Sequence, residues 1–242
     1  MSPNPAPFLQ HLKTQKYHPR SNAHSNSLAE CIVADLVAHC PAMKQHAASG
    51  SLVYEINFTL HPGTSEWNVD LVLGRPGIDA APLLEAGLII ERARPSTVLV
   101  AIEIKSVMTE HHKAVKNRKR DLEAHHDHVH RYRSDAIAGG VLVINGAQTF
   151  RSPLRPETTT HRNPDDLVRH CLSELRAVAS RSRLEESGLD AKCAVVLDID
   201  NENPTTFRYL TRSPAPQTGD PLHYDAFVQT VCALYERRFG DR

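Results

Sequence analysis

The sequence has no net charge, because 28 Lys and Arg residues are balanced by 28 Asp and Glu residues in a chain of 242. This balance excludes a histone-like protein that binds polyanions through bulk charge, so any surface for nucleic acid must be local. The 15 histidines add positive charge only as the pH falls towards their usual pKa of about 6.5. Hydrophobic residues make up 40% of the chain, which is enough for the core of one large domain or two small ones.

The sequence also lacks paired cysteines and long apolar runs. Its five cysteines are scattered and form no CxxC pair, which argues against a disulfide framework or a zinc ribbon and favours a reducing compartment. The longest apolar stretches, such as residues 98–102, are far shorter than the roughly 20 residues of a membrane span. Residues 1–10 lack a charged start followed by a hydrophobic run. We therefore expect a cytoplasmic protein that is neither exported nor inserted into a membrane.

The N-terminal part of the chain changes character near Ser27. Residues 1–26 are rich in Pro, Asn, Ser and His without an apolar period, which predicts an extended or loop-rich arm. From Ser27 onwards apolar residues recur at helical spacing until Pro41, and Ser27 with Glu30 has the spacing of a capping box. No repeat or long linker divides the rest of the chain, so we expect one domain over residues 27–242.

Three strands are predicted after this helix. Residues 52–60 alternate strictly, which places five apolar side chains on one face of a half-buried strand. Residues 67–74 form the returning strand after a turn at 61–65 and end at a glycine. Residues 75–96 are interpreted as an insertion that contains a short helix or strand. Residues 97–106 are almost continuously Val, Leu and Ile, which is typical of a central strand covered on both faces.

A helix over about residues 118–138 is predicted next, ended by Gly139 and Gly140, and followed by a strand at 141–145. The order of strand, helix and strand predicts a crossover to a parallel neighbour. The chain continues in the same way with a predicted helix, strand and helix at 165–183, 192–199 and 224–238. We therefore expect one α/β domain with helices on the faces of a sheet.

Three charged residues interrupt the predicted core strands. Asp70 lies among Val and Leu, and Glu103 and Lys105 lie two residues apart on one face of the strand at 97–106. Burying them unpaired would cost several kcal/mol each, so they must be paired, metal-bound or at a wet end of the sheet. A plain ion pair with Lys105 would account for one acid. The second acid leaves negative charge that Mg²⁺ would satisfy.

This arrangement resembles the PD-(D/E)xK nuclease superfamily, which includes many type II restriction endonucleases. The resemblance is carried by Asp70, by Glu103-Ile104-Lys105 at the end of the central strand, and by the order of elements over residues 27–145. It implies a three-layer α/β/α sandwich around a mixed central sheet, with residues 146–242 as an elaboration. The sequence departs from the motif in having Val69 where the name has Pro and a long gap of 33 residues between the two acids.

The resemblance also implies the activity and its residues. Asp70 and Glu103 would bind Mg²⁺, or Mn²⁺ in its place, together with the backbone carbonyl of Ile104. Lys105 would orient the attacking water or help to deprotonate it. The implied function is a type II restriction endonuclease that cuts double-stranded DNA as a homodimer. The alternatives are a repair, recombination or anti-phage nuclease with structure-dependent or no sequence specificity, and a non-catalytic DNA-binding module with the same fold.

Other candidate residues have both a functional and an ordinary interpretation. Glu30 is a candidate fourth acid from the first helix, and an exposed capping residue is equally compatible with its position. Glu55 lies on the polar face of the strand at 52–60, where it would reach the metal or simply face solvent. A basic run after Lys105 would contact DNA phosphates or form a solvated face: Lys113, Lys116, Arg118, Lys119 and Arg120.

Histidines are concentrated between residues 125 and 130. His126 and His130 are four residues apart on one helical face, but no acid accompanies them in an HExxH arrangement, which argues against zinc. Packing or DNA contact is the better interpretation for them and for His125. His128 and Tyr132 share a second face, in the helix where some superfamily members place residues near the active site. Both are therefore second-tier candidates.

Overall fold

The computed structural model describes residues 6–18, 20–78, 83–84, 89–109 and 111–240. The described helices are α1 (Ala6–Thr14), α2 (Ala23–His39), α3 (Pro41–Ala48), α4 (His111–Tyr132), α5 (Pro164–Ala177) and α6 (Tyr224–Phe239), with a short 3-10 helix at Pro204–Thr206. The described strands are β1 (Val53–Leu60), β2 (Trp67–Pro76), β3 (Leu83–Leu84), β4 (Glu91–Arg92), β5 (Pro95–Val107), β6 (Ile137–Asn145), β7 (Thr149–Arg151), β8 (Thr158–Thr160), β9 (Ala191–Asp198) and β10 (Arg208–Tyr209).

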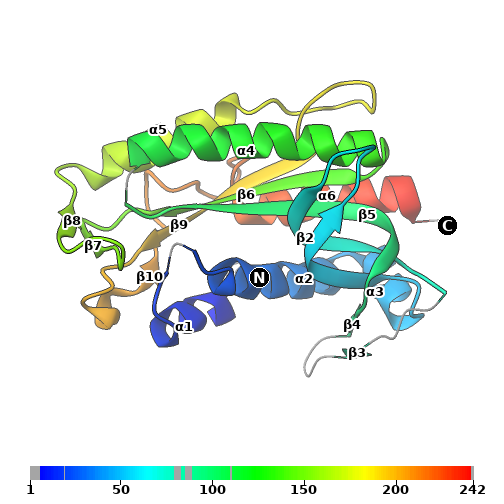
Figure 1. The fold of residues 1–242 in the computed structure, drawn as a ribbon, viewed down its shortest axis with the longest axis horizontal. Helices are drawn as coiled ribbons and strands as arrows, with labels where there is room; N and C mark the ends of the chain where they lie inside the picture. Colours follow the sequence, from blue (N-terminus) through cyan, green and yellow to red (C-terminus); the bar gives the residue numbers. More distant parts are fainter. Residues whose placement is uncertain (1–5, 19, 79–82, 85–88, 110, 241–242) are drawn as a thin grey trace.

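The main sheet of the described chain is mixed and has the strand order β10-β9-β6-β5-β2-β1-β4-β3, while β7 and β8 form a separate pair. Strand β2 is antiparallel to both β1 and β5, whereas β5, β6 and β9 run parallel. This confirms the predicted hairpin, the crossover to a parallel neighbour and the α/β class. Helices α4 and α5 cover one face of the sheet, and α2, α3 and α6 cover the other (Figure 1).

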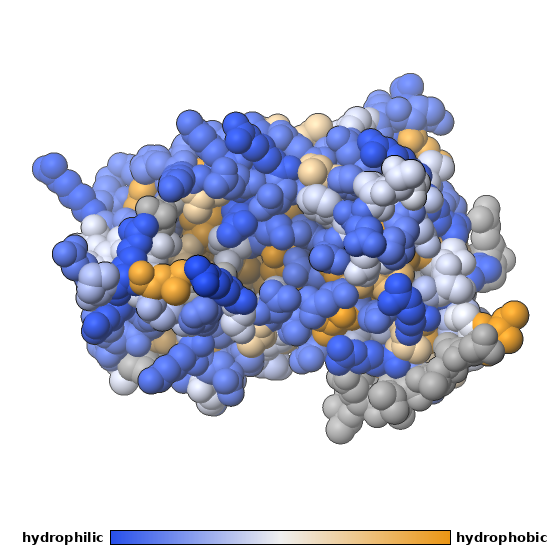
Figure 2. All heavy atoms as spheres, viewed as in Figure 1, coloured by the Kyte–Doolittle hydropathy of each residue, from blue (hydrophilic) through white to orange (hydrophobic). Residues whose placement is uncertain are grey.

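Two hydrophobic clusters, one on each side of the sheet, form the core. One cluster joins α1, α2 and α6 to the sheet, and the other joins α4 and α5 to it. The face shown in Figure 2 is mainly hydrophilic, with apolar side chains scattered over it in small patches. Among the described residues, no helix combines the length and the apolar character that crossing a membrane would require.

The N-terminal arm differs from the prediction, because residues 6–14 form helix α1. Phe8 and Leu12 lie four residues apart, so a helix places both on one face, where they are buried in the core. The next helix begins at Ala23 and not at Ser27, so Ser27 lies inside α2 and the expected capping box is wrong. Pro41 does follow the end of α2, and it opens α3.

The boundaries around α4 also differ from the prediction. The helix begins at His111 and ends at Tyr132, and Gly139 and Gly140 lie inside β6 instead of ending a helix. A Cβ atom added to Gly140 would lie 2.8 Å from the side chain of Leu189, so that side chain would have to shift to make room for it. Strand β2 continues past the glycine that was expected to end it, and α5 ends earlier than predicted. The predicted short element near residue 83 lies partly outside the described residues, which include β3 and β4 there.

Candidate active site

Strands β2 and β5 bring the predicted acids together. Leu71 pairs with Ile102, so Asp70 lies beside Glu103 at the next position of the register. The Oδ2 atom of Asp70 accepts a hydrogen bond of 2.7 Å from the backbone N–H of Ile104. The sheet therefore holds Asp70 next to the segment that carries Glu103, Ile104 and Lys105.

The candidate site lies where the apolar side chains of β1 switch from one face of the sheet to the other. Tyr54 and Ile56 of β1 belong to the core beneath α2 and α6, whereas Phe58 belongs to the core beneath α4 and α5. Asn57 between them has a φ of 59°, which reverses the alternation, and it lies opposite Asp70. The expectation that all apolar side chains of this strand share one face is therefore wrong. Asn57 and Asp70, which lie opposite each other at this reversal, are outside both hydrophobic clusters. The two strands therefore carry polar side chains at this point.

Glu103 is almost fully buried, with 2% of its surface exposed. Its Oε1 atom forms an ion pair with the Nζ atom of Lys105. Among the described residues, its Oε2 atom has no hydrogen-bond partner, and it lies 3.8 Å from Nδ1 of His125, which is also unpartnered there. The other ring nitrogen of His125 lies 3.2 Å from the carbonyl of Ala101, so His125 donates to that carbonyl and stays in place beside the acid. Lys105 thus pairs with one oxygen of this carboxyl group and leaves the other oxygen without a hydrogen bond among the described residues.

Burial raises the cost of ionising both acids. Burial, followed by the negative charge of Asp70, raises the pKa of Glu103 to about 8. Burial also raises the pKa of Asp70, although Lys105 and the N–H of Ile104 oppose this. Burial by itself would lower the pKa of Lys105, but the charges of Glu103 and Asp70 outweigh it and raise that pKa. Lys105 therefore carries a positive charge at neutral pH, and the acids would be further stabilised by another cation.

These residues fit a hard divalent cation. Carboxylate and carbonyl oxygens are the ligands that Mg²⁺ and Mn²⁺ prefer. Asp70, Glu103 and the backbone carbonyl of Ile104 would hold the ion, and the unpartnered Oε2 atom of Glu103 supplies a free ligand atom. A buried oxygen without a partner is costly in a finished core, so this atom is available to a ligand; the Oε2 atom of Glu55 is also buried and unpartnered.

A cavity of about 270 Å³ adjoins Asp70 and Lys105. Its opposite wall comes from the connection between α1 and α2 and the start of α2, through Tyr17, His24 and Ser25. The Ser25 side chain lowers the pKa of Asp70 against the larger effect of burial, and Tyr17 stacks on His24 with ring centroids 5.6 Å apart. The sequence does not reveal these three residues, because the stretch that carries them has no catalytic motif and its composition predicts a loop-rich arm.

Other predicted acids lie elsewhere. Glu30 is on the exposed side of α2 and does not line the cavity, whereas Ser25 of the same helix does. Glu55 on β1 lies 3.9 Å from the guanidinium of Arg94. The structure thus places Glu55 in a contact with Arg94 and not in one with Asp70 or Glu103.

The residues of the basic run lie on α4 but have different surroundings. Arg118 lines the cavity, donates a hydrogen bond of 3.3 Å to the carbonyl of Ser106 and pairs with Asp121 at 3.0 Å. Lys119 pairs with Glu174 of α5 at 3.5 Å. The other members of the run are exposed and do not line the cavity: Lys113, Lys116 and Arg120. Arg118 is therefore the member that the structure brings to the candidate site.

The second-tier residues of α4 also lie apart from the cavity. His128 stacks on Trp67 with ring centroids 4.5 Å apart, and Tyr132 packs against the core beneath α4. His130 contacts Asp190 at 3.2 Å, and His126 contacts its neighbour Asp127. These contacts place the histidines in packing and in a buried polar network.

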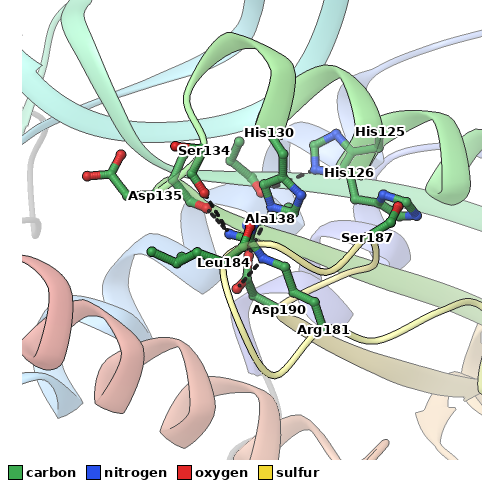
Figure 3. Close-up of polar contacts among 12 residues, drawn as sticks. His125, His126, His130, Ser134, Asp135, Ala138, Arg181, Leu184, Ser187 and Asp190 are labelled. Atoms are coloured by element: carbon green, nitrogen blue, oxygen red, sulfur yellow. Dashed lines mark hydrogen bonds and ion pairs between the residues drawn. The ribbon is translucent and has the colours of Figure 1, made fainter.

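That network surrounds Asp190, just before β9 (Figure 3). Its carboxylate accepts hydrogen bonds from Arg181 at 3.0 Å, Arg238 at 2.6 Å and the backbone N–H of Ala138 at 2.8 Å, in addition to the contact with His130. Burial alone would raise the pKa of Asp190, but these hydrogen bonds outweigh burial and hold it well below its usual range. The network is structural, because it lies apart from the residues that line the candidate site.

Acid is therefore expected to destabilise the protein through Asp190. A carboxyl group whose pKa is lowered by folding contributes stability that is complete above its unfolded pKa of about 3.9 and is lost as the pH falls towards the folded value. Urea unfolding of the wild type and of Asp190→Asn, measured from about pH 5 down to about pH 2.5, checks this. The wild type should lose more unfolding free energy over this range than the variant. Equal losses would show that Asp190 does not titrate as expected.

The candidate active site thus consists of the half-buried Asp70 with Lys105 and Arg118, which line the cavity closed by the α1–α2 connection, and of the buried Glu103, which pairs with Lys105 but is not among the lining residues. These parts come from β2, β5, α4 and the N-terminal helices. Their arrangement suits chemistry on an anionic substrate with the help of a divalent cation. No protein-family model matches the chain and no curated protein matches it, so the function has to be argued from this geometry.

Proposed function

We propose that this protein is a Mg²⁺-dependent DNA endonuclease of the PD-(D/E)xK type, with the restriction-endonuclease-like fold. The observation that carries the proposal is that Asp70 and Lys105 line a cavity, while the buried Glu103 pairs with Lys105 and keeps one oxygen without a partner among the described residues. A structural ion pair would need only one of the two acids. The second acid is costly without a cation, and a cation next to a cationic side chain is suited to a phosphodiester substrate.

Each residue has a separate part in the hydrolysis. A bound Mg²⁺ would offset the charge that develops on the phosphate oxygens. Lys105, which Glu103 and Asp70 keep protonated, would donate a hydrogen bond to the attacking water or to the phosphate. This favours orienting the water over deprotonating it. Arg118 lines the same cavity and would contact a neighbouring phosphate.

A second cavity extends the site towards α1. It has a volume of about 530 Å³ and shares Leu12, Tyr17 and Met108 with the first cavity. Four basic side chains line it, from α1, its C-terminal connection and the segment of β7: Lys13, Lys16, Arg151 and Arg155. We therefore place the DNA backbone along α1 and the β7–β8 pair as well as over the candidate site.

Replacing Lys13 and Lys16 together by Ala is expected to weaken DNA binding and its salt dependence. Both side chains are exposed, so the fold should be unaffected. Each lost phosphate contact should lower the slope of log K against log salt by about 0.9. Fluorescence anisotropy with a labelled duplex in EDTA, over a series of salt concentrations, measures both quantities.

The matched control is the double variant Lys113→Ala and Lys116→Ala, which removes two exposed lysines from α4. Binding by this control should stay close to the wild-type value if DNA follows α1. A larger loss in the control than in the α1 variant would place the DNA on α4 instead.

The activity itself is tested on unmethylated supercoiled plasmid with Mg²⁺ or Mn²⁺, and with EDTA. We expect metal-dependent cleavage into discrete fragments, since the implied enzyme is a restriction endonuclease. A smear would favour a nuclease without sequence specificity. No cleavage by folded protein that still binds DNA would favour a non-catalytic module. One site per chain cuts one strand, so we also propose a homodimer, which sedimentation of the DNA complex checks.

A further inference from the structure

Two cysteines meet at the contact between α2 and α6, away from the candidate active site. Cys40 directly follows α2 and is fully buried, and Cys232 lies on α6 and is partly exposed. Their Sγ atoms lie within 4.8 Å of each other. The Sγ atom of Cys40 lies 3.9 Å from the carbonyl of Cys232, and the Sγ atom of Cys232 lies 3.7 Å from the carbonyl of His39. The two helices thus present a pair of sulfur atoms to one small space.

Glu236 completes a set of three ligand atoms. It lies one helical turn after Cys232, so its carboxylate faces the same side of α6. One carboxylate oxygen and the two Sγ atoms all lie within 4.8 Å of one another. Among the residues that the structure describes, this is the one group of three such side chains with that spacing.

The space beside these atoms favours a cation. It is a cavity of about 530 Å³ whose walls include Cys232, Glu236, Asp35 and Asp225. None of the described residues that line it is a lysine or an arginine. His39, the last residue of α2, also lines the cavity, but its ring nitrogens are not among the ligand atoms that lie within 4.8 Å of one another. Cys40 of the set is fully buried and is not among the lining residues.

We infer that Cys40, Cys232 and Glu236 form a binding site for a thiophilic divalent cation of the Zn²⁺ class. Zinc holds sulfur at about 2.3 Å and oxygen at about 2.1 Å in a tetrahedron, so the two sulfurs of a bound site lie about 3.8 Å apart. Because the three ligand atoms already lie within 4.8 Å of one another, small movements would bring them to this geometry. The ion would displace the thiol protons and fasten α2 to α6. This site is independent of the nuclease proposal, because thiolates are poor ligands for Mg²⁺.

Cobalt is the probe for this site, because tetrahedral Co²⁺ bound to thiolates gives characteristic charge-transfer and d–d absorption bands. The full-length chain is reduced, treated with EDTA, freed of chelator and titrated with Co²⁺ in excess Mg²⁺. We expect one Co²⁺ per chain with thiolate bands, which Zn²⁺ then displaces. Cys232→Ser should weaken binding by at least about 100-fold, and Glu236→Gln by about 10-fold to 100-fold.

The matched control is Cys171→Ser, which removes a buried thiol from α5 and should keep the bands. Asp70→Asn should keep them too, because it belongs to the other site. Circular dichroism checks that each variant is folded. Because Glu236 is exposed, Glu236→Gln is the variant least expected to disturb the fold. The absence of thiolate bands in the reduced wild type would overturn the inference. Bands that survive in both Cys232→Ser and Glu236→Gln would also overturn it.

Discussion

Asp70→Asn is expected to lower the rate of Mg²⁺-dependent DNA cleavage by at least about 10³-fold. The substitution keeps the size of the side chain and leaves an oxygen to accept the hydrogen bond from the N–H of Ile104. It removes the negative charge that would hold the cation beside Glu103. Single-turnover cleavage of a labelled duplex at saturating enzyme measures the effect on chemistry separately from binding.

Glu103→Gln and Lys105→Met should show a comparable loss of cleavage, for related reasons. The first removes the acid with the unpartnered buried oxygen, and the second removes the cation that we expect to orient the water. The stability of Glu103→Gln should not fall in parallel, because burial and Asp70 already make ionisation of Glu103 unfavourable. Urea unfolding of the same samples separates loss of function from loss of fold.

Glu55→Gln is the matched control for these three variants. Glu55 is an acid on β1 whose Oε1 atom contacts Arg94 and whose Oε2 atom is buried and unpartnered like that of Glu103, but it does not line the cavity. Its replacement should change the rate less than about 5-fold, which is far below the effect expected for a metal ligand. Wild-type cleavage by Asp70→Asn, or an equal loss in all four variants, would contradict the assignment of the site.

The central part of the site could be predicted from the sequence because charge stands out in an apolar strand. Asp70, Glu103 and Lys105 each interrupt a run of Val, Leu and Ile, and a strand has a fixed alternation that places Glu103 and Lys105 on one face. The convergence of two acids on one lysine was predicted from the same pattern. These are local rules, and the structure brings the three residues together as they require.

The wall of the cavity could not be predicted in this way. Tyr17, His24 and Ser25 approach Asp70 only because α1 packs on the core and carries the following segment across the ends of the strands. That contact joins segments far apart in the chain, and nothing in the spacing of either segment specifies it. The signal for α1 is the spacing of Phe8 and Leu12, but a single apolar pair at this spacing also occurs by chance in loops.

The reversal at Asn57 shows a second limit. Alternation from Leu52 to Leu60 predicts one buried face, but both faces of this sheet are covered by helices. An apolar side chain is therefore satisfied on either side, and the pattern does not reveal a change of face. The positive φ of Asn57 is a property of one residue within an otherwise regular strand. Asparagine is among the residues that adopt this conformation, but it does so in many turns as well.

Asp190→Ala is expected to lower the free energy of unfolding by about 3–5 kcal/mol, because removing one partner from a buried ion network leaves the others unpaired. Asp190 and Arg181 are each only 1% exposed in their side chains, and Arg238 is 10% exposed. Arg181 also donates to the backbone carbonyls of Ser134 and Ala136, so it is held in place and cannot turn to solvent when the carboxylate is lost. Urea unfolding at neutral pH measures the change.

Asp165→Ala is the control for this prediction, because Asp165 forms an exposed ion pair with Arg212 at 3.6 Å. Exposed pairs of this kind contribute about 0–1 kcal/mol, so the control should remain near wild-type stability. The network joins α6, β6 and the segment before β9, far along the chain from one another, and its loss should therefore lower the stability of the whole domain. A change below about 1 kcal/mol in Asp190→Ala would mean that the two arginines find other partners or water. In that case the fold would depend on its hydrophobic clusters alone at this end of the sheet.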